Sequence, residues 1–379
     1  MYRPTWVEIN LDNLAFNFQQ VKNIVGERVG ILAAVKANAY GHSMREVCQR
    51  LEQCGVDYFG VSSVNEAADL REANISAKIL ILGSLLSEQE MRLALNLNAE
   101  ITVPDYRSAE ILNKLCSAEN KAKLHLKIDT GMGRLGVWHN NALDFVSKVI
   151  ELEKVQVKGI YTHLPSSGSD FEFTQKQISI FQDLIVKIKK NKINIQFFHI
   201  ANSTAVCRFK KGFFNLVRPG IMLYGIYPCA KKFIGFDLQL KPVLSFKTKI
   251  VYLKDVPAGR TISYSGTFTT KKKTKIATLA VGYADGYRRG LSNKARVLVK
   301  GEFAQVVGNV CMGQTMIDVG HIPDVCLGDQ VTLIGVDKDK TITVEELADI
   351  CATITYEIIC GISARVPRKF IRNTDTLLL

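Results

Sequence analysis

The stretch GILAAVKANAYGH (residues 30–42) begins with a short apolar run and ends in polar residues and glycine. Seven further runs of this kind follow along the chain, and the segments between them have helical composition and periodicity. Runs that are apolar on both faces and alternate with helices indicate a parallel sheet. The eight runs begin at residues 30, 57, 78, 99, 122, 155, 195 and 215.

Eight such units favour a (β/α)8 TIM-type barrel over an open, doubly wound sheet with fewer strands. After about residue 235 the pattern changes to strand-like runs punctuated by Gly, Asp and Pro. That pattern indicates a mostly antiparallel β domain. We therefore predict an α/β protein with a barrel in residues 1–235 and a β domain in residues 236–379. Residues 1–10 alternate like a strand that can join the second sheet.

Composition excludes several classes of protein. The 379 residues are 47% hydrophobic, close to a globular average, and can form a core without disulfides. The nine cysteines are odd in number and irregularly spaced, which indicates free thiols in a reducing compartment. The N-terminus lacks a signal-peptide pattern, and no run of about 18 apolar residues occurs. We expect a cytoplasmic protein with no membrane partner.

The net charge of +13 raises the question of a nucleic-acid partner. The lysine clusters are short, scattered and free of interleaved aromatic residues, so they are typical of a soluble surface rather than a nucleic-acid site. No His, Cys and Asp residues occur with the spacing of metal ligands, so we expect no metal site. The basic surface can still attract anionic small molecules.

Polar, reactive side chains recur where the barrel runs end. Barrel enzymes build their active sites at the carboxyl ends of the strands, so we expect these side chains to share one site. Lys36 ends the first run, where poor solvation favours the neutral amine and makes it a nucleophile toward a carbonyl cofactor. The others are Arg134 after the fifth run, His163 after the sixth, Asn202 and Ser203 after the seventh, and Arg218 in the eighth.

The segment AVKANAYGH resembles the cofactor-lysine motif of alanine racemases, which are fold-type III pyridoxal-phosphate enzymes. The resemblance extends from Trp6 to about Arg372. It implies a homodimeric isomerase with composite active sites and pyridoxal 5'-phosphate as cofactor. Its reaction would interconvert L-alanine and D-alanine, the latter for a bacterial cell wall. The further motifs, in family order, are KIDTGMGRLG, HIANS, VRPGIMLYG, ISYSGTF, VGYADGY, GNVCM, TYEI and RVPR.

The resemblance also implies which residues bind the cofactor. Lys36 would hold it covalently, and Arg218 would face its pyridine nitrogen. Arginine keeps its proton, since its pKa lies above about 12, so the ring nitrogen would stay unprotonated. A weak electron sink disfavours transamination and favours simple reprotonation, which is racemisation. The phosphate would be bound by Tyr40, Asn202, Ser203, Gly220, Ile221 and Tyr356.

Racemisation needs a base on each face of the substrate Cα. The resemblance implies Lys36 on one face and Tyr264, from the partner subunit, on the other. His163 and Arg218 would form a hydrogen-bonded chain to Tyr264 that adjusts its basicity.

The substrate carboxylate would be bound by Arg134, because a planar guanidinium fits a carboxylate. Lys127, which is often carbamylated in this family, would brace that arginine. Across the dimer, the backbone N–H of Met312 would hold the other carboxylate oxygen, and Tyr283 would line the entrance.

Three positions depart from the usual family pattern. Gly313 replaces an aspartate, Asn309 replaces an arginine, and Gly168 stands where a further aspartate is expected unless Asp170 compensates. These changes predict a less charged and wider entrance, so they leave serine or other small amino acids open as substrates. Other hypotheses are a decarboxylase, aldolase or lyase on this scaffold, a non-catalytic carrier of the cofactor, and a nucleic-acid binder.

Overall fold

The computed structural model describes residues 3–372, so the first two and the last seven residues of the expected domains lie outside the described part. The chain forms two compact units, each described here by itself. We call them the barrel unit and the β unit. The barrel unit comprises residues 14–39 and 44–240, and the β unit comprises residues 3–13, 40–43 and 241–372.

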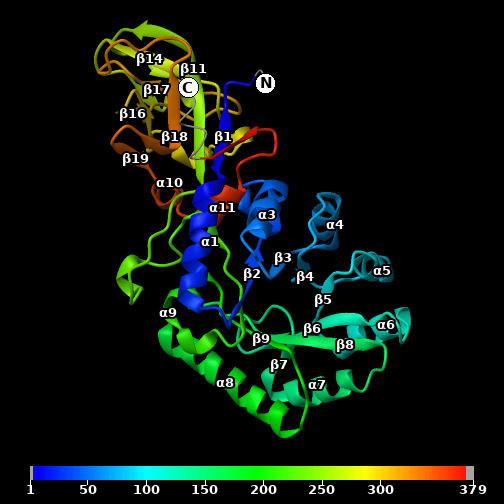
Figure 1. The fold of residues 1–379 in the computed structure, drawn as a ribbon. Coiled ribbons are helices and arrows are strands. Elements are labelled where there is room, and N and C mark those ends of the chain that lie inside the picture. The colour runs from blue at the N-terminus through cyan, green and yellow to red at the C-terminus, as the bar shows by residue number, and fades with distance from the viewer. Residues whose placement is uncertain (1–2, 373–379) are drawn as a thin grey trace. The chain divides into compact units, whose positions relative to one another are not determined.

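The barrel unit contains eight parallel strands, one within each of the eight apolar runs (Figure 1). Their order is β10-β2-β3-β4-β5-β6-β8-β9, and an isolated bridge between Asn202 and Arg218 connects the two ends. The barrel is thus nearly closed, and the predicted fold class is confirmed. The strands are β2 (Gly30–Ala34), β3 (Tyr58–Val61), β4 (Lys78–Ile81), β5 (Glu100–Val103), β6 (Ala122–Asp129), β8 (Val155–Tyr161), β9 (Phe197–His199) and β10 (Leu216–Val217), with β7 (Val137–Trp138) paired to β6.

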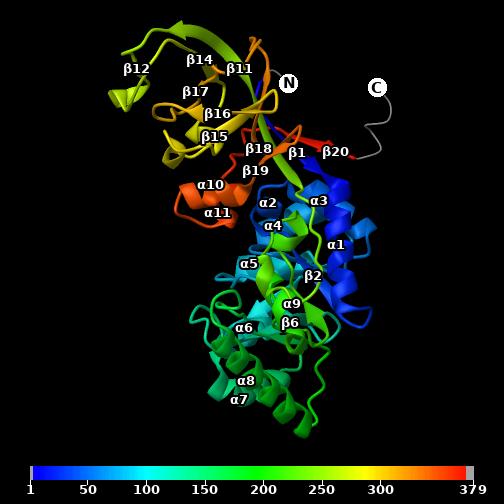
Figure 2. The ribbon, with the colours of Figure 1, turned by 90° about the vertical axis from the view of Figure 1, so that its left-hand side faces the viewer.

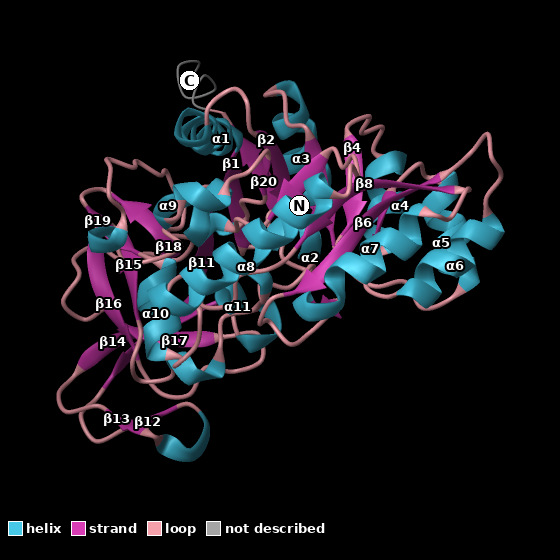
Figure 3. Ribbon diagram, turned by 90° about the horizontal axis from the view of Figure 1, so that it is seen from below, coloured by secondary structure: helices cyan, strands magenta, loops and turns pink. Residues whose placement is uncertain are grey.

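Helices alternate with these strands, as the secondary-structure colours of Figure 3 show. Several begin at side chains that accept a hydrogen bond from the first turn, which satisfies otherwise unpaired amides. Ser87 and Glu90 form a reciprocal capping box at one helix start. The helices are α1 (Leu11–Val25), which begins in the β unit, α3 (Met44–Gln53), α4 (Val64–Glu72), α5 (Glu88–Asn96), α6 (Tyr106–Leu115), α7 (Ala142–Ile150), α8 (Phe171–Lys190) and α9 (Ser203–Arg208).

The β unit is built on a mostly antiparallel sheet, as predicted (Figure 2). Strand β18 pairs with both β15 and β11, so six strands close a ring in the order β11-β14-β17-β16-β15-β18. The strands are β1 (Trp6–Asn10), β11 (Leu244–Val256), β12 (Thr261–Ile262), β13 (Phe268–Thr269), β14 (Thr274–Leu279), β15 (Arg296–Val299), β16 (Glu302–Val306), β17 (Thr315–Asp318), β18 (Gln330–Asp337), β19 (Lys340–Ile342) and β20 (Arg368–Ile371), and the helices are α10 (Val344–Ile350) and α11 (Thr355–Cys360).

The beginning of the chain belongs to this second sheet. Strand β1 pairs antiparallel with β11 and parallel with β20. Between residues 3 and 372, no helix is both long and apolar enough to cross a lipid bilayer.

Candidate functional site

Lys36 lies just beyond β2 and begins a single turn, α2 (Lys36–Tyr40), with unusual backbone geometry. Ala37, Asn38 and Ala39 all have φ of 53°, and Tyr40 has φ of 55°, so the turn is left-handed. For residues with a Cβ this conformation costs roughly 1–2 kcal/mol per residue. Strain of this kind persists where the surroundings impose it, typically at functional sites. The sequence analysis did not predict this turn.

The left-handed turn is held by side chains from neighbouring segments of the barrel unit. The Ala37 amide donates to Oε1 of Glu66 at 2.7 Å, and the second oxygen of Glu66 accepts from the Ser62 amide at 2.7 Å. Asn38 Oδ1 accepts from the Met44 amide at 2.7 Å, at the start of α3. These contacts set the direction in which Lys36 leaves the barrel strand.

Lys127, on β6, is a buried lysine among other cations. Its Nζ lies 3.2 Å from the carbonyl oxygen of Ile128 and 5.2 Å from the ring centroid of Tyr161. Burial, followed by the charges of Arg218 and Arg134, lowers the pKa of Lys127 to about 7. A lysine with that pKa is partly neutral at neutral pH and can act as a nucleophile.

His163 follows β8 and experiences the same positive field. Burial and the charges of Arg218, Lys127, Arg134 and Lys36 together hold its pKa well below the usual value, so its imidazole is neutral. These four cations, which come from the ends of β2, β6 and β10, therefore lie within electrostatic reach of one histidine. The barrel unit thus brings together five of the side chains that the sequence singled out.

Arg134, which follows β6, is exposed. Its guanidinium makes no hydrogen bond or ion pair with any described residue, although its charge acts on Lys127 and His163. It is therefore available to bind an anion.

Arg218, just after β10, is 6% exposed, and its guanidinium is fixed by hydrogen bonds. Nη1 donates to Nδ1 and to the carbonyl oxygen of His199, each at 2.8 Å. Nη2 donates to the carbonyl oxygens of Thr162 at 2.7 Å and Ile200 at 3.3 Å. Among the described residues the Nε–H has no acceptor, so it is the donor that remains for a ligand. Burial lowers the pKa of Arg218 to about 10, which leaves it charged at neutral pH.

These contacts differ from the chain expected between Arg218, His163 and Tyr264. No hydrogen bond joins Arg218 to His163 within the described residues, because the Nη groups face His199 and three carbonyl oxygens instead. His163 and Arg218 are coupled through the field rather than through a shared proton.

Four of the residues expected to bind phosphate, Asn202, Ser203, Gly220 and Ile221, follow β9 and β10. Ser203 Oγ accepts from the Gly220 amide at 2.8 Å, which joins the two strand ends. In the 3-10 turn Ile221–Tyr224, the first hydrogen bond runs from the Leu223 amide to the Gly220 carbonyl. The Ile221 amide therefore has no acceptor inside the turn and can donate to an anion.

The Asn202 side chain is largely used inside the protein. Its Nδ2 donates to the Leu164 carbonyl at 3.0 Å. Its Oδ1 caps α9 by accepting from the Ala205 amide at 3.0 Å and also accepts from Ser167 Oγ at 3.1 Å. Asn202 thus holds the strand-end loops in place, and its second Nδ2 hydrogen remains for the phosphate contact predicted from the sequence.

Tyr40 and Tyr356 both belong to the β unit and pack against each other, with ring centroids 5.9 Å apart. Burial raises the pKa of Tyr40 above its usual value and that of Tyr356 to about 12. Both hydroxyls are therefore protonated donors at neutral pH.

Three site candidates of the β unit are exposed: Tyr264 at 72%, Met312 at 62% and Tyr283 at 44%. Backbone hydrogen bonds connect their loops, since the Tyr283 amide donates to the Cys311 carbonyl and the Ala284 amide to the Met312 carbonyl, both at 3.0 Å. The Met312 amide itself has no acceptor among residues 3–372. The three side chains form one uncovered group, which we call the tyrosine face (Tyr264, Tyr283 and Met312).

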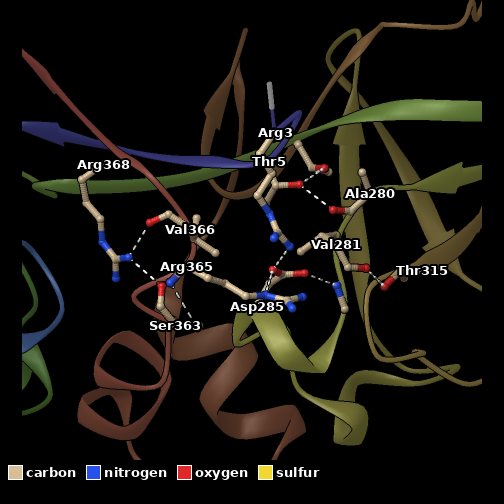
Figure 4. Close-up of polar contacts among 12 residues, drawn as sticks. Arg3, Thr5, Ala280, Val281, Asp285, Thr315, Ser363, Arg365, Val366 and Arg368 are labelled. Carbon is tan, nitrogen blue, oxygen red and sulfur yellow. Dashed lines mark hydrogen bonds and ion pairs between the residues drawn. The ribbon is translucent and has the colours of Figure 1, made fainter. Parts of the chain in front are cut away.

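The turn that carries Tyr283 contains a buried carboxylate, Asp285, whose contacts Figure 4 shows. Asp285 accepts hydrogen bonds from Arg3, from Arg365 Nε at 2.8 Å and from the Gly282 amide at 3.0 Å. The turn that carries Tyr283 is therefore anchored to residues close to both ends of the described chain.

The structure gives each departure from the family pattern a local setting. Asn309 Nδ2 donates to the Tyr264 carbonyl at 2.8 Å, so this residue anchors the Tyr264 loop. A Cβ on Gly313 would meet only Arg365 Nη2, at 3.9 Å, so an aspartate fits there beside a cation. Asp170 accepts from the Phe173 amide at 2.9 Å and caps α8, so it does not substitute for an aspartate at Gly168.

Comparison with known proteins agrees with this arrangement. The model of the alanine racemase N-terminal domain matches residues 9–228, and that of the alanine racemase C-terminal domain matches residues 243–370. The chain belongs to the alanine racemase family. The resemblance drawn from the motifs is confirmed, as is the class of enzyme that it implied, an isomerase. This family depends on pyridoxal phosphate.

Similar proteins cover nearly the whole chain. An alanine racemase of Halothermothrix orenii is 46% identical over 370 residues, which is 97% of each chain. The structure of an alanine racemase of Clostridium difficile 630 has a TM-score of 0.91 at 36% identity and covers 98% of this chain and 97% of its own. An alanine racemase structure of Bacillus anthracis with bound L-Ala-P has a TM-score of 0.91 at 37% identity, with 98% and 96% covered.

Sequence reasoning missed four buried residues, of which His199 and Tyr161 contact Arg218 and the other two lie beyond His199: Glu100, His125, Tyr161 and His199. Tyr161 stacks on His199 with centroids 4.7 Å apart and lies 5.0 Å from the Arg218 guanidinium. A signal was present, because His125 is flanked by leucines and His199 follows two phenylalanines, and a polar side chain buried among apolar neighbours needs a partner.

We expect the Lys127 amine to form a carbamate with dissolved CO2, because its lowered pKa leaves a neutral fraction at neutral pH. At a fixed CO2 concentration, occupancy should fall as the pH drops below about 7, where the amine is protonated. Carbon-13 NMR of the protein equilibrated with 13C-labelled bicarbonate measures this directly. The control is Lys127→Met, which should lose the resonance; a signal that persists in this variant would show that another amine reacts.

Proposed function

We propose that this protein interconverts L-alanine and D-alanine, with pyridoxal 5'-phosphate bound to Lys36. One observation carries the proposal: in a chain of this family, the charges of Lys36, Lys127, Arg134 and Arg218 all act on a buried and neutral His163. Such a field attracts a phosphate, a phenolate and a carboxylate, and these are the anionic groups of the cofactor and of an amino-acid substrate.

The donors present fit that cofactor. The Ile221 amide and the strand-end loops around Ser203 suit a phosphate, as do the protonated hydroxyls of Tyr40 and Tyr356. In this proposal Gly220 allows the backbone to approach the phosphate. Asn202 fixes the loops through its side-chain partners, and its second Nδ2 hydrogen can donate to the phosphate.

When bound, the cofactor withdraws electrons from the substrate Cα and makes its hydrogen acidic. The Lys36 amine takes or returns the proton on one face of Cα. The Tyr264 oxygen of a second subunit does so on the other face. General acid–base groups at both faces are what inversion of configuration requires.

Arg218 directs the chemistry toward racemisation. Its Nε–H would donate to the ring nitrogen of the cofactor, and its pKa of about 10 keeps the proton on the guanidinium at neutral pH. The ring nitrogen would then stay unprotonated and the cofactor would withdraw electrons only modestly, which favours return of a proton to Cα from Lys36 or Tyr264. This argues against a decarboxylase, aldolase or lyase on the same scaffold.

Arg134 binds the substrate carboxylate, since it is exposed and without a protein partner. A carbamate on Lys127 would brace it and offset part of the positive charge. The unpaired Met312 amide supplies a donor for the second carboxylate oxygen, from the other subunit.

We further propose a cytosolic homodimer with two composite sites. Support comes from the tyrosine face, because a tyrosine that is 72% exposed cannot act as a shielded base until another molecule covers it. In a two-fold dimer the same surface of each subunit serves the other, so one contact completes both sites.

We expect Lys36→Ala to lose both the lysine-bound cofactor absorbance and activity. Tyr264→Phe should keep the absorbance but lower kcat by roughly 10²–10⁴-fold, as expected for a lost general base. The assay follows both alanine enantiomers and Cα deuterium in D2O by chiral chromatography and mass spectrometry. Tyr252→Phe, at a tyrosine of the same unit that is also exposed, is the control and should be unaffected. If the wild type binds the cofactor but inverts nothing, the protein is a carrier instead.

Mixing the two inactive variants tests the composite site. A dimer of one Lys36→Ala subunit and one Tyr264→Phe subunit contains one fully native site and one doubly altered site. An equimolar mixture allowed to exchange subunits should recover about one quarter of wild-type activity. No recovery, with mixed dimers verified by mass spectrometry, would mean that each subunit uses its own Tyr264.

Serine is the second candidate substrate, because Gly313 and Asn309 leave fewer charges near the tyrosine face than the usual family pattern. We expect Gly313→Asp to lower the serine-to-alanine ratio of kcat/KM by up to about tenfold, within the roughly 1–3 kcal/mol that such a pocket can discriminate. Gly313→Ala is the matched control, since it adds the Cβ without the charge. Equal ratios in both variants would show that this charge does not select the substrate.

A further inference from the structure

Arg218 has a buried positive charge without a carboxylate in direct contact. Its Nη groups donate only to an imidazole nitrogen and to carbonyl oxygens. A buried charge is costly unless it is paired. Of the groups that accept from Arg218, only the His199 ring can itself donate a further hydrogen bond. The group that compensates the charge of Arg218 is therefore sought beyond His199.

Three short hydrogen bonds lead from Arg218 to a buried carboxylate on the far side of the barrel interior. Arg218 Nη1 to His199 Nδ1 is 2.8 Å, His199 Nε2 to His125 Nδ1 is 2.8 Å, and His125 Nε2 to Glu100 Oε2 is 2.6 Å. Both histidines are 0% exposed, and Glu100 is 3% exposed. We call this series of four residues the relay (Arg218, His199, His125 and Glu100).

The donor chemistry of arginine determines every proton in the relay. A guanidinium only donates, so His199 Nδ1 must accept, and the neutral His199 carries its proton on Nε2. That proton points at His125 Nδ1, which must also accept, so His125 carries its proton on Nε2. This last proton points at Glu100, which accepts as a carboxylate. Both histidines are thus neutral, and all three bonds donate toward Glu100.

Every alternative that keeps all three bonds needs either a neutral guanidine on Arg218 or an imidazolate. Moving all three protons one step toward Arg218, for example, gives a neutral guanidine and a protonated Glu100. The acidities of the two ends disfavour it. Arg218 has a pKa of about 10. Burial acts to raise the pKa of Glu100, but the hydrogen bonds from His125 and Tyr58, together with nearby positive charge, outweigh burial and lower that pKa. Burial and the charge of Arg218 hold the pKa of His199 well below its usual value, which agrees with a neutral ring.

Residues on the neighbouring barrel strands leave room for the two imidazole rings and pack against them. A Cβ on Gly159, opposite His125 on β8, would lie only 2.4 Å from His125 Nδ1, so any side chain there would displace the ring. Tyr161 stacks on His199 at an interplanar angle of 8°, and Phe197 stacks on His125 at 12°. The ring planes are therefore set by packing before any hydrogen bond forms.

We propose that Glu100 is the counter-charge of Arg218. His125 and His199 connect the two groups by hydrogen bonds and act as positioning residues, which keep the guanidinium charged and fix its orientation. That this orientation of Arg218 serves the cofactor rests on the proposed function. The relay itself concerns only the barrel interior. Glu100 lies at the first residue of β5, and Tyr58, at the first residue of β3, donates to its other oxygen at 3.2 Å.

The first test needs no variant. Long-range 1H–15N NMR of the holoenzyme labelled with 15N-histidine distinguishes the two neutral tautomers and the cation, and the chain has only six histidines. We expect both His125 and His199 to show the neutral tautomer with the proton on Nε2, as the directions of the hydrogen bonds require. An Nδ1–H tautomer or an imidazolium at either position overturns the proposal.

The second test removes the charge. Glu100→Gln keeps an acceptor for His125 but leaves Arg218 without a counter-charge. We expect kcat to fall by roughly ten- to a hundredfold, the range typical of outer partners that orient a functional ligand, while KM for alanine changes little. Asp57→Asn is the control, because Asp57 precedes Tyr58 and accepts from the Ile31 amide at 2.8 Å without joining the relay.

The outcomes separate the two proposals. If Glu100→Gln and Asp57→Asn have equal kcat in an active racemase, the counter-charge proposal fails and the proposed function stands. If the wild type shows the expected tautomers but no racemase activity, the proposed function fails and the relay stands. Should Glu100→Gln not fold, the tautomers of the wild type still decide the proposal.

Discussion

Eight parallel strands that close on each other present all their carboxyl ends at one end of the barrel, and the rest of the site depends on that constraint. Each strand end carries its own polar side chain, and here several of these are cations. The charges of Lys36, Lys127, Arg134 and Arg218 make it harder for His163 to gain a proton, and the charges of Arg218 and Arg134 do the same for Lys127. Burial of Lys127 and Arg218 adds to this effect.

The result is a positively charged site that can bind anionic ligands. Its positive charges are held by carbonyl oxygens, by neutral imidazoles and by the face of Tyr161, which Lys127 and Arg218 both approach. Few of the groups in contact are carboxylates, so an anionic ligand meets little competition. The proposed counter-charge of Arg218, Glu100, is separated from it by the imidazoles of His199 and His125. From there it stabilises the guanidinium without occupying the position of a ligand.

The site candidates of the tyrosine face in the β unit are exposed, whereas most of those in the barrel unit are buried. Tyr264, Tyr283 and Met312 lie on loops without regular pairing, yet those loops are anchored by Asn309, by the backbone of Cys311 and by buried Asp285. Anchored but uncovered side chains are typical of a surface that functions only when another molecule contacts it. The replacement of an arginine by Asn309 therefore has a structural role that its position next to a motif did not indicate.

The sequence by itself determined the class of fold and the family. The number of apolar runs between helices predicts the number of barrel strands, because a strand buried on both faces needs an apolar local composition. The family can be recognised because its motifs are contiguous segments. Which residues stand at strand ends was predictable for the same reason. Only the tertiary structure decided the left-handed turn after Lys36 and the partners of Arg218. It also showed that Asn202 holds the strand-end loops in place. Glu100, His125 and His199 lie on different strands, and their hydrogen bonds depend on register and ring orientation across the barrel, which no local pattern of residues encodes.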